Sequence, residues 1–126
     1  MGQNMVGWFE IPVTDMDRAK KFYENVFEIT IQIQDFGGTK MGWFPWTEGE
    51  TGCSGSLILQ PEWYIPNHKE GVLIYFSSEN VQNELDRIEN VGGRILKAKT
   101  LISPDIGYMG LFHDSEGNRI ALHSRK

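Results

Sequence analysis

The sequence predicts an α+β fold in which two βαβββ modules form a curved mixed sheet around a cleft. Three observations support this fold class. A β-prone segment at residues 8–13 runs directly into an amphipathic helix, three more β-prone segments follow, and the same order of elements starts again 65 residues later. At 126 residues the chain has a common length for one domain, so we expect a single domain over residues 1–126.

The first module is expected at about residues 5–60. Thr14 and Asp15 supply side-chain oxygens that can cap a helix directly after the first strand. Apolar residues then recur at helical spacing, so the helix buries one side; they are Met16, Ala19, Phe22, Tyr23, Val26 and Phe27. Glycine-containing turns separate the three strands that are predicted next, at residues 30–36, 41–46 and 54–60.

The second module is expected at about residues 72–124, after a proline-containing link at residues 61–71. It repeats the first: a strand at residues 72–77 precedes Asn80, a good helix cap, and the helix that follows is expected to stop at Gly92-Gly93. A shift of 65 positions places Asp15 on Asn80, Glu24-Asn25-Val26 on Glu89-Asn90-Val91, and Gly42-Trp43 on Gly107-Tyr108.

Several short motifs carry a family resemblance. They are Ile11-Pro12-Val13 with Asp15, Arg18-Ala19, Phe22-Tyr23, Gly92-Gly93 and Asp114-Ser115-Glu116-Gly117-Asn118. Together they resemble the vicinal oxygen chelate superfamily, which includes glyoxalases, extradiol dioxygenases, fosfomycin-resistance enzymes and bleomycin-binding proteins. The resemblance covers nearly the whole chain and implies the glyoxalase/bleomycin resistance/dioxygenase fold. It does not name a reaction, because one fold hosts many functions.

Composition narrows the function classes. Twelve basic and 17 acidic residues give a net charge of −5, which argues against a nucleic-acid partner, because binding phosphates needs clustered Lys and Arg. No apolar run approaches the roughly 20 residues of a membrane span, and no signal-peptide pattern begins the chain, so we expect no membrane association and a cytoplasmic location. The single cysteine, Cys53, fits a reducing compartment, and no nearby His suggests a nucleophile.

Strand parity predicts which side chains face the cleft, because alternate residues point to opposite faces of a sheet. In the first strand Phe9, Ile11 and Val13 must cover the helix, so Trp8, Glu10 and Pro12 face the cleft. In the strand from Val72, the residues Val72, Ile74 and Phe76 are expected under the second helix. The other cleft-facing residues predicted by this argument are Ser56, Ile58, Gln60, Leu73, Tyr75, Ser77, Arg119, Ala121 and His123.

The resemblance implies four positions for metal ligands, one on the first and last strand of each module. In metal-using relatives these lie seven residues before the residue that caps each helix or seven after the turn Asp. In this chain those positions hold Trp8, Ser56, Leu73 and Ala121, none of which is a His or a carboxylate. Because a divalent metal needs about three such ligands, we expect the standard metal site to be absent.

Glu10 lies two residues after Trp8 in the first strand, and His123 lies two residues after Ala121 in the last strand. They are candidate catalytic residues, and also candidate ligands of a shifted site for Zn, Ni, Mn or Fe, with Tyr75 or Gln60 as a weak third ligand. They could instead form a metal-free acid/base pair, in which Glu10 would favour protonated His123. A third alternative is purely structural: Glu10 pairs with His123 or with Arg119, since buried charges are normally matched.

Aromatic rings are the second feature of the predicted cleft. Trp8 and Tyr75 would make good walls for a flat or apolar small molecule, and the other candidate contacts are Ile58, Gln60, Leu73, Ala121 and Arg119. Trp63-Tyr64 in the link is a candidate lid or oligomer contact. The resemblance also implies a homodimer, in which one cleft takes residues from two chains.

Two functions from different classes follow. In the first, the protein is a metal-free binder of a small organic molecule, like the bleomycin-binding members. In the second, it is a metal-dependent lyase, isomerase or dioxygenase in which Glu10 and His123 act as ligands, acid or base. Replacement of all four standard ligand positions favours the binding function.

Overall fold

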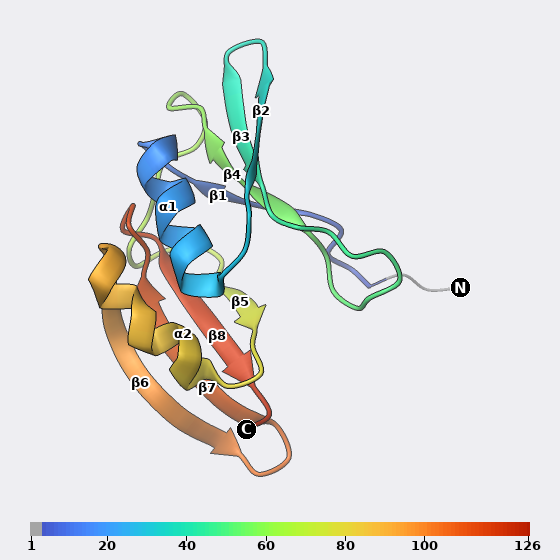
Figure 1. The fold of residues 1–126 in the computed structure, drawn as a ribbon, viewed down its shortest axis with the longest axis vertical. Coiled ribbons are helices and arrows are strands. Elements are labelled where there is room, and N and C mark those ends of the chain that lie inside the picture. Colours follow the sequence, from blue (N-terminus) through green and yellow to red (C-terminus); the bar gives the residue numbers. More distant parts are fainter. Residues whose placement is uncertain (1–3) are drawn as a thin grey trace.

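The structure, a computed structural model, describes residues 4–126 and consists of two four-stranded sheets and two helices (Figure 1). Sheet A has the order β1-β4-β3-β2 and sheet B the order β5-β8-β7-β6. The first module contains β1 (Phe9–Pro12), α1 (Met16–Phe27), β2 (Gln32–Phe36), β3 (Thr39–Trp43) and β4 (Gly55–Leu59). The second contains β5 (Ile74–Ser77), α2 (Val81–Ile88), a 3₁₀ turn (Glu89–Val91), β6 (Arg94–Ser103), β7 (Gly107–His113) and β8 (Arg119–Ser124). The predicted α+β fold of two βαβββ modules is confirmed.

Strand pairing repeats between the modules. In each sheet the first and last strands pair in parallel and the remaining pairs are antiparallel. Glu10 lies opposite Ser56 in sheet A, and Tyr75 lies opposite Ala121 in sheet B, which is the predicted offset of 65. The two helices also begin alike, because the side chains of Asp15 and Asn80 accept hydrogen bonds from backbone N–H groups of the first turn.

The predicted alignment of Trp43 with Tyr108 is wrong. Trp43 pairs with Ser56, whereas the residue that pairs with Ala121 is Leu111, so the offset has grown to 68. The second module has three more residues between the start of its helix and this position, and its β6–β7 pairing contains register shifts that accommodate extra residues.

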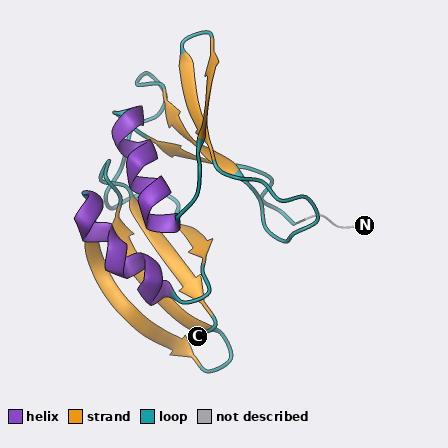
Figure 2. Ribbon diagram, in the orientation of Figure 1, coloured by secondary structure: helices purple, strands orange, loops and turns teal. Residues whose placement is uncertain are grey.

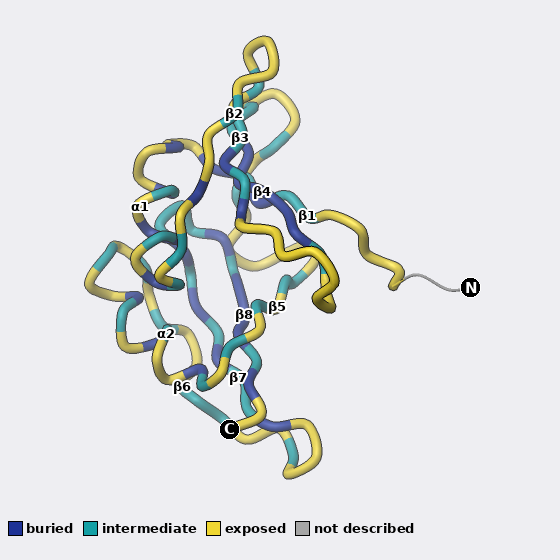
Figure 3. Tube along the Cα trace, turned by 45° about the vertical axis from the view of Figure 1, so that its right-hand side comes forward, coloured by how far each residue is buried: buried dark blue, intermediate teal, exposed yellow. Residues whose placement is uncertain are grey.

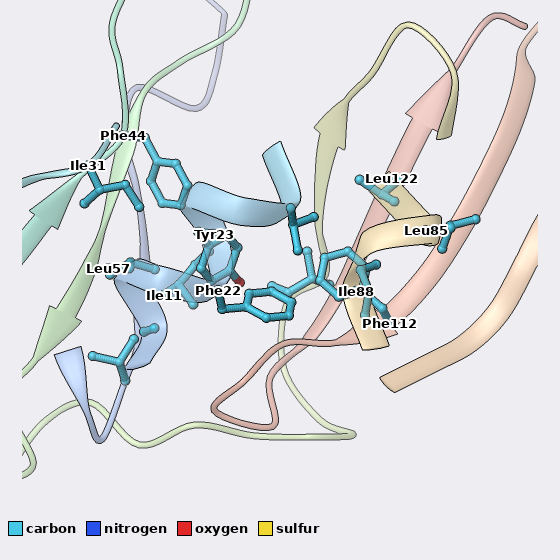
Figure 4. Packing of buried hydrophobic residues seen from close by; sticks show 14 of the residues in the cluster. Ile11, Phe22, Tyr23, Ile31, Phe44, Leu57, Leu85, Ile88, Phe112 and Leu122 are labelled. Carbon is cyan, nitrogen blue, oxygen red and sulfur yellow. The ribbon is translucent and has the colours of Figure 1, made fainter. Parts of the chain in front are cut away.

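One hydrophobic core serves both modules. It contains helix-facing residues of sheet A and sheet B together with residues of both helices, which lie side by side (Figures 1 and 2). In Figure 4, Phe22 and Tyr23 of α1 lie between Leu57 of sheet A on one side and Ile88 and Phe112 on the other. Since both sheets turn their helix-facing sides toward this core, their opposite sides point away from it.

The strand-parity prediction fails at Val72. This residue precedes β5 and is 88% exposed, so it does not lie under α2. Phe76 does point to the helix side, but it packs against Phe27 of α1 and Phe44 of the first module, with ring centroids 4.8 and 5.4 Å apart. The Phe76 ring therefore joins β5 to the first module.

Burial is deepest in β4 and β8, the strands that pair with the first strand of each module. Both are buried along most of their length, whereas the hairpin of β2 and β3 extends away from the helices and β2 is largely exposed (Figure 3). Among residues 4–126, no helix is both long and apolar enough to cross a membrane.

Candidate functional site

Three side chains form a row across sheet A, on the face opposite α1. Glu10 of β1 lies opposite Ser56 of β4, and Ser56 lies opposite Trp43 of β3. Directly opposed residues in neighbouring strands have Cβ atoms about 5 Å apart, so the three side chains are neighbours. We call Glu10, Ser56 and Trp43 the polar row.

Aromatic rings flank the polar row on two sides. Trp8 meets the indole of Trp43 edge to face with ring centroids 6.3 Å apart, and Phe36 stacks against the same indole at 6.1 Å. Trp8 is 45% exposed and Phe36 is 56% exposed. This face of sheet A therefore presents large rings to solvent beside hydrogen-bonding groups.

The link contributes a partner for Glu10 that the sequence did not predict. The Tyr64 hydroxyl donates a hydrogen bond to the Glu10 carboxylate at 2.7 Å. This hydrogen bond, together with desolvation and the negative charge of Glu10, raises the pKa of Tyr64. Trp63, the other ring of the predicted lid, is 79% exposed. Tyr64 is thus held over β1, whereas Trp63 points into solvent.

A cavity of about 430 Å³ lies between β1, the link and the β5–β8 edge of sheet B. We call it the first cavity; its walls include Trp8, Glu10, Pro12, Ile65, Ile74 and Arg119. Among residues 4–126 neither Glu10 nor Arg119 takes part in a salt bridge, and the Arg119 guanidinium donates a hydrogen bond to the Gly71 carbonyl at 3.4 Å. Glu70 also lines this cavity, so a largely apolar wall carries two carboxylates and one guanidinium, none of which forms a salt bridge among residues 4–126.

A second cavity, of about 610 Å³, runs along the outer edge of β5. Its walls are mostly apolar and include Leu73, Tyr75, Phe44, Phe76 and the half-buried Cys53. The predicted contacts Leu73 and Tyr75 therefore line a different hollow from Trp8, Glu10 and Arg119.

His123 lies on sheet B, away from Glu10's partners. Its Nε2 atom is 2.7 Å from the carbonyl oxygen of Ile106. Because a carbonyl only accepts hydrogen bonds, Nε2 carries the proton in this contact. Glu10 and His123 are each engaged with a different group, and His123 lines neither of the two cavities described above. Within the described part of the chain, no three His, Cys, Asp or Glu residues are grouped closely enough to hold a metal ion.

Two of the remaining predicted contacts are buried, and the third holds a local turn. Ile58 is 2% exposed and Ala121 is fully buried, so neither offers surface to a ligand in this structure. The Gln60 side-chain oxygen accepts a hydrogen bond from the backbone N–H of Glu62 and holds the turn that begins the link. The structure brings together Trp8, Glu10 and Arg119 of the predicted set.

A turn of the second module, residues 114–118, holds the end of β1 in place. The Glu116 carboxylate accepts hydrogen bonds from the backbone N–H groups of Thr14 (2.8 Å) and Asp15 (3.0 Å), and from Arg18, whose Nε lies 2.7 Å away. Burial opposes ionisation of Glu116, but these hydrogen bonds, with one from Ser115, outweigh it and lower its pKa to about 2. The carboxylate thus caps α1 from another module.

The same turn makes a second, buried contact. The Tyr23 hydroxyl donates to the Asp114 carboxylate at 2.6 Å, and the Asn118 amide donates to the Pro12 carbonyl at 2.7 Å. Burial raises the pKa of Asp114, although its hydrogen bonds act in the opposite direction. These contacts fix where β1 lies against sheet B, and so set the shape of the first cavity.

Comparisons with known proteins agree with this architecture. A family model described as "Glyoxalase/Bleomycin resistance protein/Dioxygenase superfamily" matches residues 5–122. A glyoxylase-like domain-containing protein of Didymella fabae is 28% identical over 123 residues, which are 95% of this chain and 93% of that protein.

Two solved structures show the same fold. A glyoxalase I variant from Zea mays has a TM-score of 0.74 at 14% identity; the match covers 94% of this chain but only 45% of the maize chain. TnmS3, an antibiotic binding protein from Streptomyces sp. CB03234, has a TM-score of 0.66 at 21% identity, and the match covers 100% of this chain and 99% of TnmS3. Both identities are low, so these two matches are evidence about fold.

Proposed function

Because the chain belongs to the Glyoxalase/Bleomycin resistance protein/Dioxygenase superfamily, we propose that it binds a small organic molecule in the first cavity. The observation that carries this proposal is the make-up of the cavity: about 430 Å³, largely apolar, with Trp8 in its wall and a few polar groups that include Glu10, Glu70 and Arg119. Small-molecule sites typically have this size and this mixture of apolar walls with a few polar groups. TnmS3, a protein of the same fold and similar length, binds an antibiotic.

We propose that this binding needs no resident metal. The four positions at which metal-using relatives carry their ligands hold Trp8, Ser56, Leu73 and Ala121 here, and none of these side chains is a ligand of the kind that Zn²⁺, Ni²⁺ or Fe²⁺ requires. Ser56 and Ala121 are also fully buried. The residues present do not fit the metal of the superfamily, and we assign it no step.

The alternative is an enzyme in which Glu10 and His123 act together. Its support is weaker, because Glu10 is hydrogen-bonded to Tyr64 and His123 to the Ile106 carbonyl, on different sheets. A homodimer that joined the exposed face of sheet A to that of sheet B would bring them closer. We expect a homodimer, because Tyr75 at the β5 edge of sheet B and Trp8 at the β1 edge of sheet A each leave about half of the side chain exposed. We also expect a cytoplasmic location.

The test is a fluorescence titration of the protein, purified in EDTA, with planar aromatic molecules such as 2-ethylnaphthalene and 2-acetylnaphthalene. We expect saturable quenching, and we expect Trp8→Ala to weaken binding by about fivefold or more, because truncating an aromatic side chain that the ligand covers costs more than about 1 kcal/mol. The matched control is Trp63→Ala, which removes a ring that is 79% exposed and lies outside the first cavity.

Two results would contradict the proposal. One is the absence of binding to every planar aromatic tested. The other is binding that appears only after Zn²⁺, Ni²⁺, Mn²⁺ or Fe²⁺ is added and that Glu10→Gln or His123→Asn abolishes, which would establish the shifted metal site instead.

A further inference from the structure

Two buried polar atoms in the polar row have no hydrogen-bond partner. They are Nε1 of Trp43 and Oγ of Ser56. Among residues 4–126, every other buried side-chain nitrogen or oxygen atom has a hydrogen-bond partner. Such an atom costs about 1–3 kcal/mol, so native proteins contain few of them. The two belong to residues that lie directly opposite each other, on the same face of sheet A.

The surroundings of this pair point to a binding role. Ser56 is 0% exposed, and Trp43 is held between the rings of Trp8 and Phe36. These two outer rings are about half exposed, so either can rotate outward without uncovering the core. A hollow of about 470 Å³ also adjoins Trp43 on its other side, between Gln32 and Trp46. The unpartnered atoms thus lie between Glu10 on one side and the half-exposed rings of Trp8 and Phe36 on the other.

The chemistry of the pair defines what it would accept. The indole N–H of Trp43 only donates, and the Ser56 hydroxyl can donate, so both can point at one acceptor oxygen with two lone pairs. Ser56 has Trp43 on one side and Glu10 on the other. The negative charge of Glu10 disfavours a carboxylate or phosphate there, which leaves a neutral oxygen such as a carbonyl.

We propose that Trp43 and Ser56 determine ligand specificity by donating two hydrogen bonds to a neutral carbonyl oxygen on a planar, apolar molecule. This inference rests on the proposed binding function and deepens it by naming the ligand class: aryl ketones and related conjugated carbonyl compounds. Trp8 turns outward as the ring of the ligand takes its place against the indole, and the Trp8 ring stays in contact with the ligand at the wall of the first cavity.

The experiment compares three probes of one shape: 2-acetylnaphthalene, 2-ethylnaphthalene, which lacks the carbonyl, and 2-naphthoate, which replaces it with a carboxylate. We expect the wild-type protein to bind the ketone about tenfold or more tightly than either of the others, because a site that hydrogen-bonds a ligand rejects the analogue without that group. Ser56→Ala and Trp43→Phe should each reduce this preference several-fold, and the reduction should come from weaker binding of the ketone rather than from tighter binding of 2-ethylnaphthalene. Trp46→Phe, which removes a different indole N–H, is the control and should keep the preference.

Two further readouts separate recognition from a structural role. In ¹H–¹⁵N spectra of the indole groups, the signal that is missing in Trp43→Phe should move downfield with 2-acetylnaphthalene but not with 2-ethylnaphthalene. Ser56→Ala should not lower the thermal stability of the free protein, because the hydroxyl it removes has no partner in the fold.

The outcomes distinguish this inference from the proposed function. Equal binding of ketone and hydrocarbon, unchanged by Ser56→Ala and Trp43→Phe, would overturn the inference and leave the binding function standing. A loss of stability in Ser56→Ala would show that the hydroxyl has a structural partner and would also overturn it. Absence of binding to all three probes would contradict both.

Discussion

At the scale of single residues, Glu116 does more than its place in a surface turn suggests. Its carboxylate, whose side chain is 0% exposed, accepts hydrogen bonds from two backbone N–H groups at the start of α1 and from Arg18. Negative charge at a helix N-terminus is favourable, and here it comes from a residue about 100 positions away in the chain. The contact therefore stabilises α1 and the packing of the modules together.

Glu116→Gln should lower the free energy of unfolding by about 1–3 kcal/mol at neutral pH, because hydrogen bonds to a charged group are lost. The folded-state pKa of about 2 is below the ordinary value of 4.5, so this stabilisation is complete above pH 4.5 and is lost as the pH falls toward 2. Urea denaturation at several pH values measures the difference between variant and wild type, which should shrink over that range.

The control is Glu28→Gln, since Glu28 is 72% exposed and faces Arg87 at 3.4 Å across the surface. Exposed pairs contribute little, so this change should cost less than about 0.5 kcal/mol. Equal effects of the two substitutions would show that Glu116 is no more than another surface charge.

At the scale of elements, the site depends on how closely β1 approaches β4. The parallel pairing places Phe9 opposite Gly55 and Glu10 opposite Ser56. A Cβ atom at Gly55 would overlap the carbonyl oxygen and the ring of Phe9. Glycine at this position therefore allows the pairing that aligns the polar row.

Gly55→Ala should destabilise the protein by about 1–3 kcal/mol, the usual cost of overpacking, because β1 must move away from β4. It should also weaken binding of 2-acetylnaphthalene, since Glu10 and Trp8 move with β1. Gly7→Ala is the matched control: a Cβ there meets no atom within 4 Å, and it should change stability by less than about 0.5 kcal/mol. A melting temperature of Gly55→Ala equal to that of the control would refute the explanation.

At the scale of the whole molecule, we expect the shared core to make the two modules one cooperative unit. Phe112 of β7 is fully buried and packs against Phe22 of α1, with ring centroids 6.0 Å apart. Arg87 of α2 donates a hydrogen bond to the Val26 carbonyl of α1 at 2.7 Å. Each helix packs on the sheet of its own module and also against the other helix.

The tryptophans make this testable, because all four lie at positions 8, 43, 46 and 63, in the first module and the link. Phe112→Ala in the second module should lower stability by about 3–5 kcal/mol, the usual cost of truncating a buried Phe. Denaturation followed by tryptophan fluorescence and by far-ultraviolet circular dichroism should shift by the same amount. Leu101→Ala, at a position 50% exposed, serves as control, and an unshifted fluorescence transition in Phe112→Ala would mean that the modules unfold independently.

Part of this site was within reach of the sequence. Alternation in β1 separates Ile11 and Val13, which are buried in the core, from Trp8, which is 45% exposed, and from Glu10, which bonds Tyr64 of the link. The same reasoning could not anticipate that Ile58 and Ala121 would be buried, or that Tyr64 would donate a hydrogen bond to Glu10. It also could not anticipate the three extra residues of the second module, which place Leu111 rather than Tyr108 opposite Ala121. Parity assigns a side of the sheet, but burial depends on what loops and neighbouring strands place over it.

The sequence by itself determined the elements and their order, because caps such as Asp15 and Asn80 and the period of apolar residues act over a few positions. Only the tertiary structure decided which candidates meet. It placed Glu10 beside Tyr64 and His123 beside the Ile106 carbonyl, and it left Trp43 and Ser56 as neighbours without partners. The physical reason is that such contacts join residues far apart in the chain, and their geometry is set by the packing of two sheets around α1 and α2.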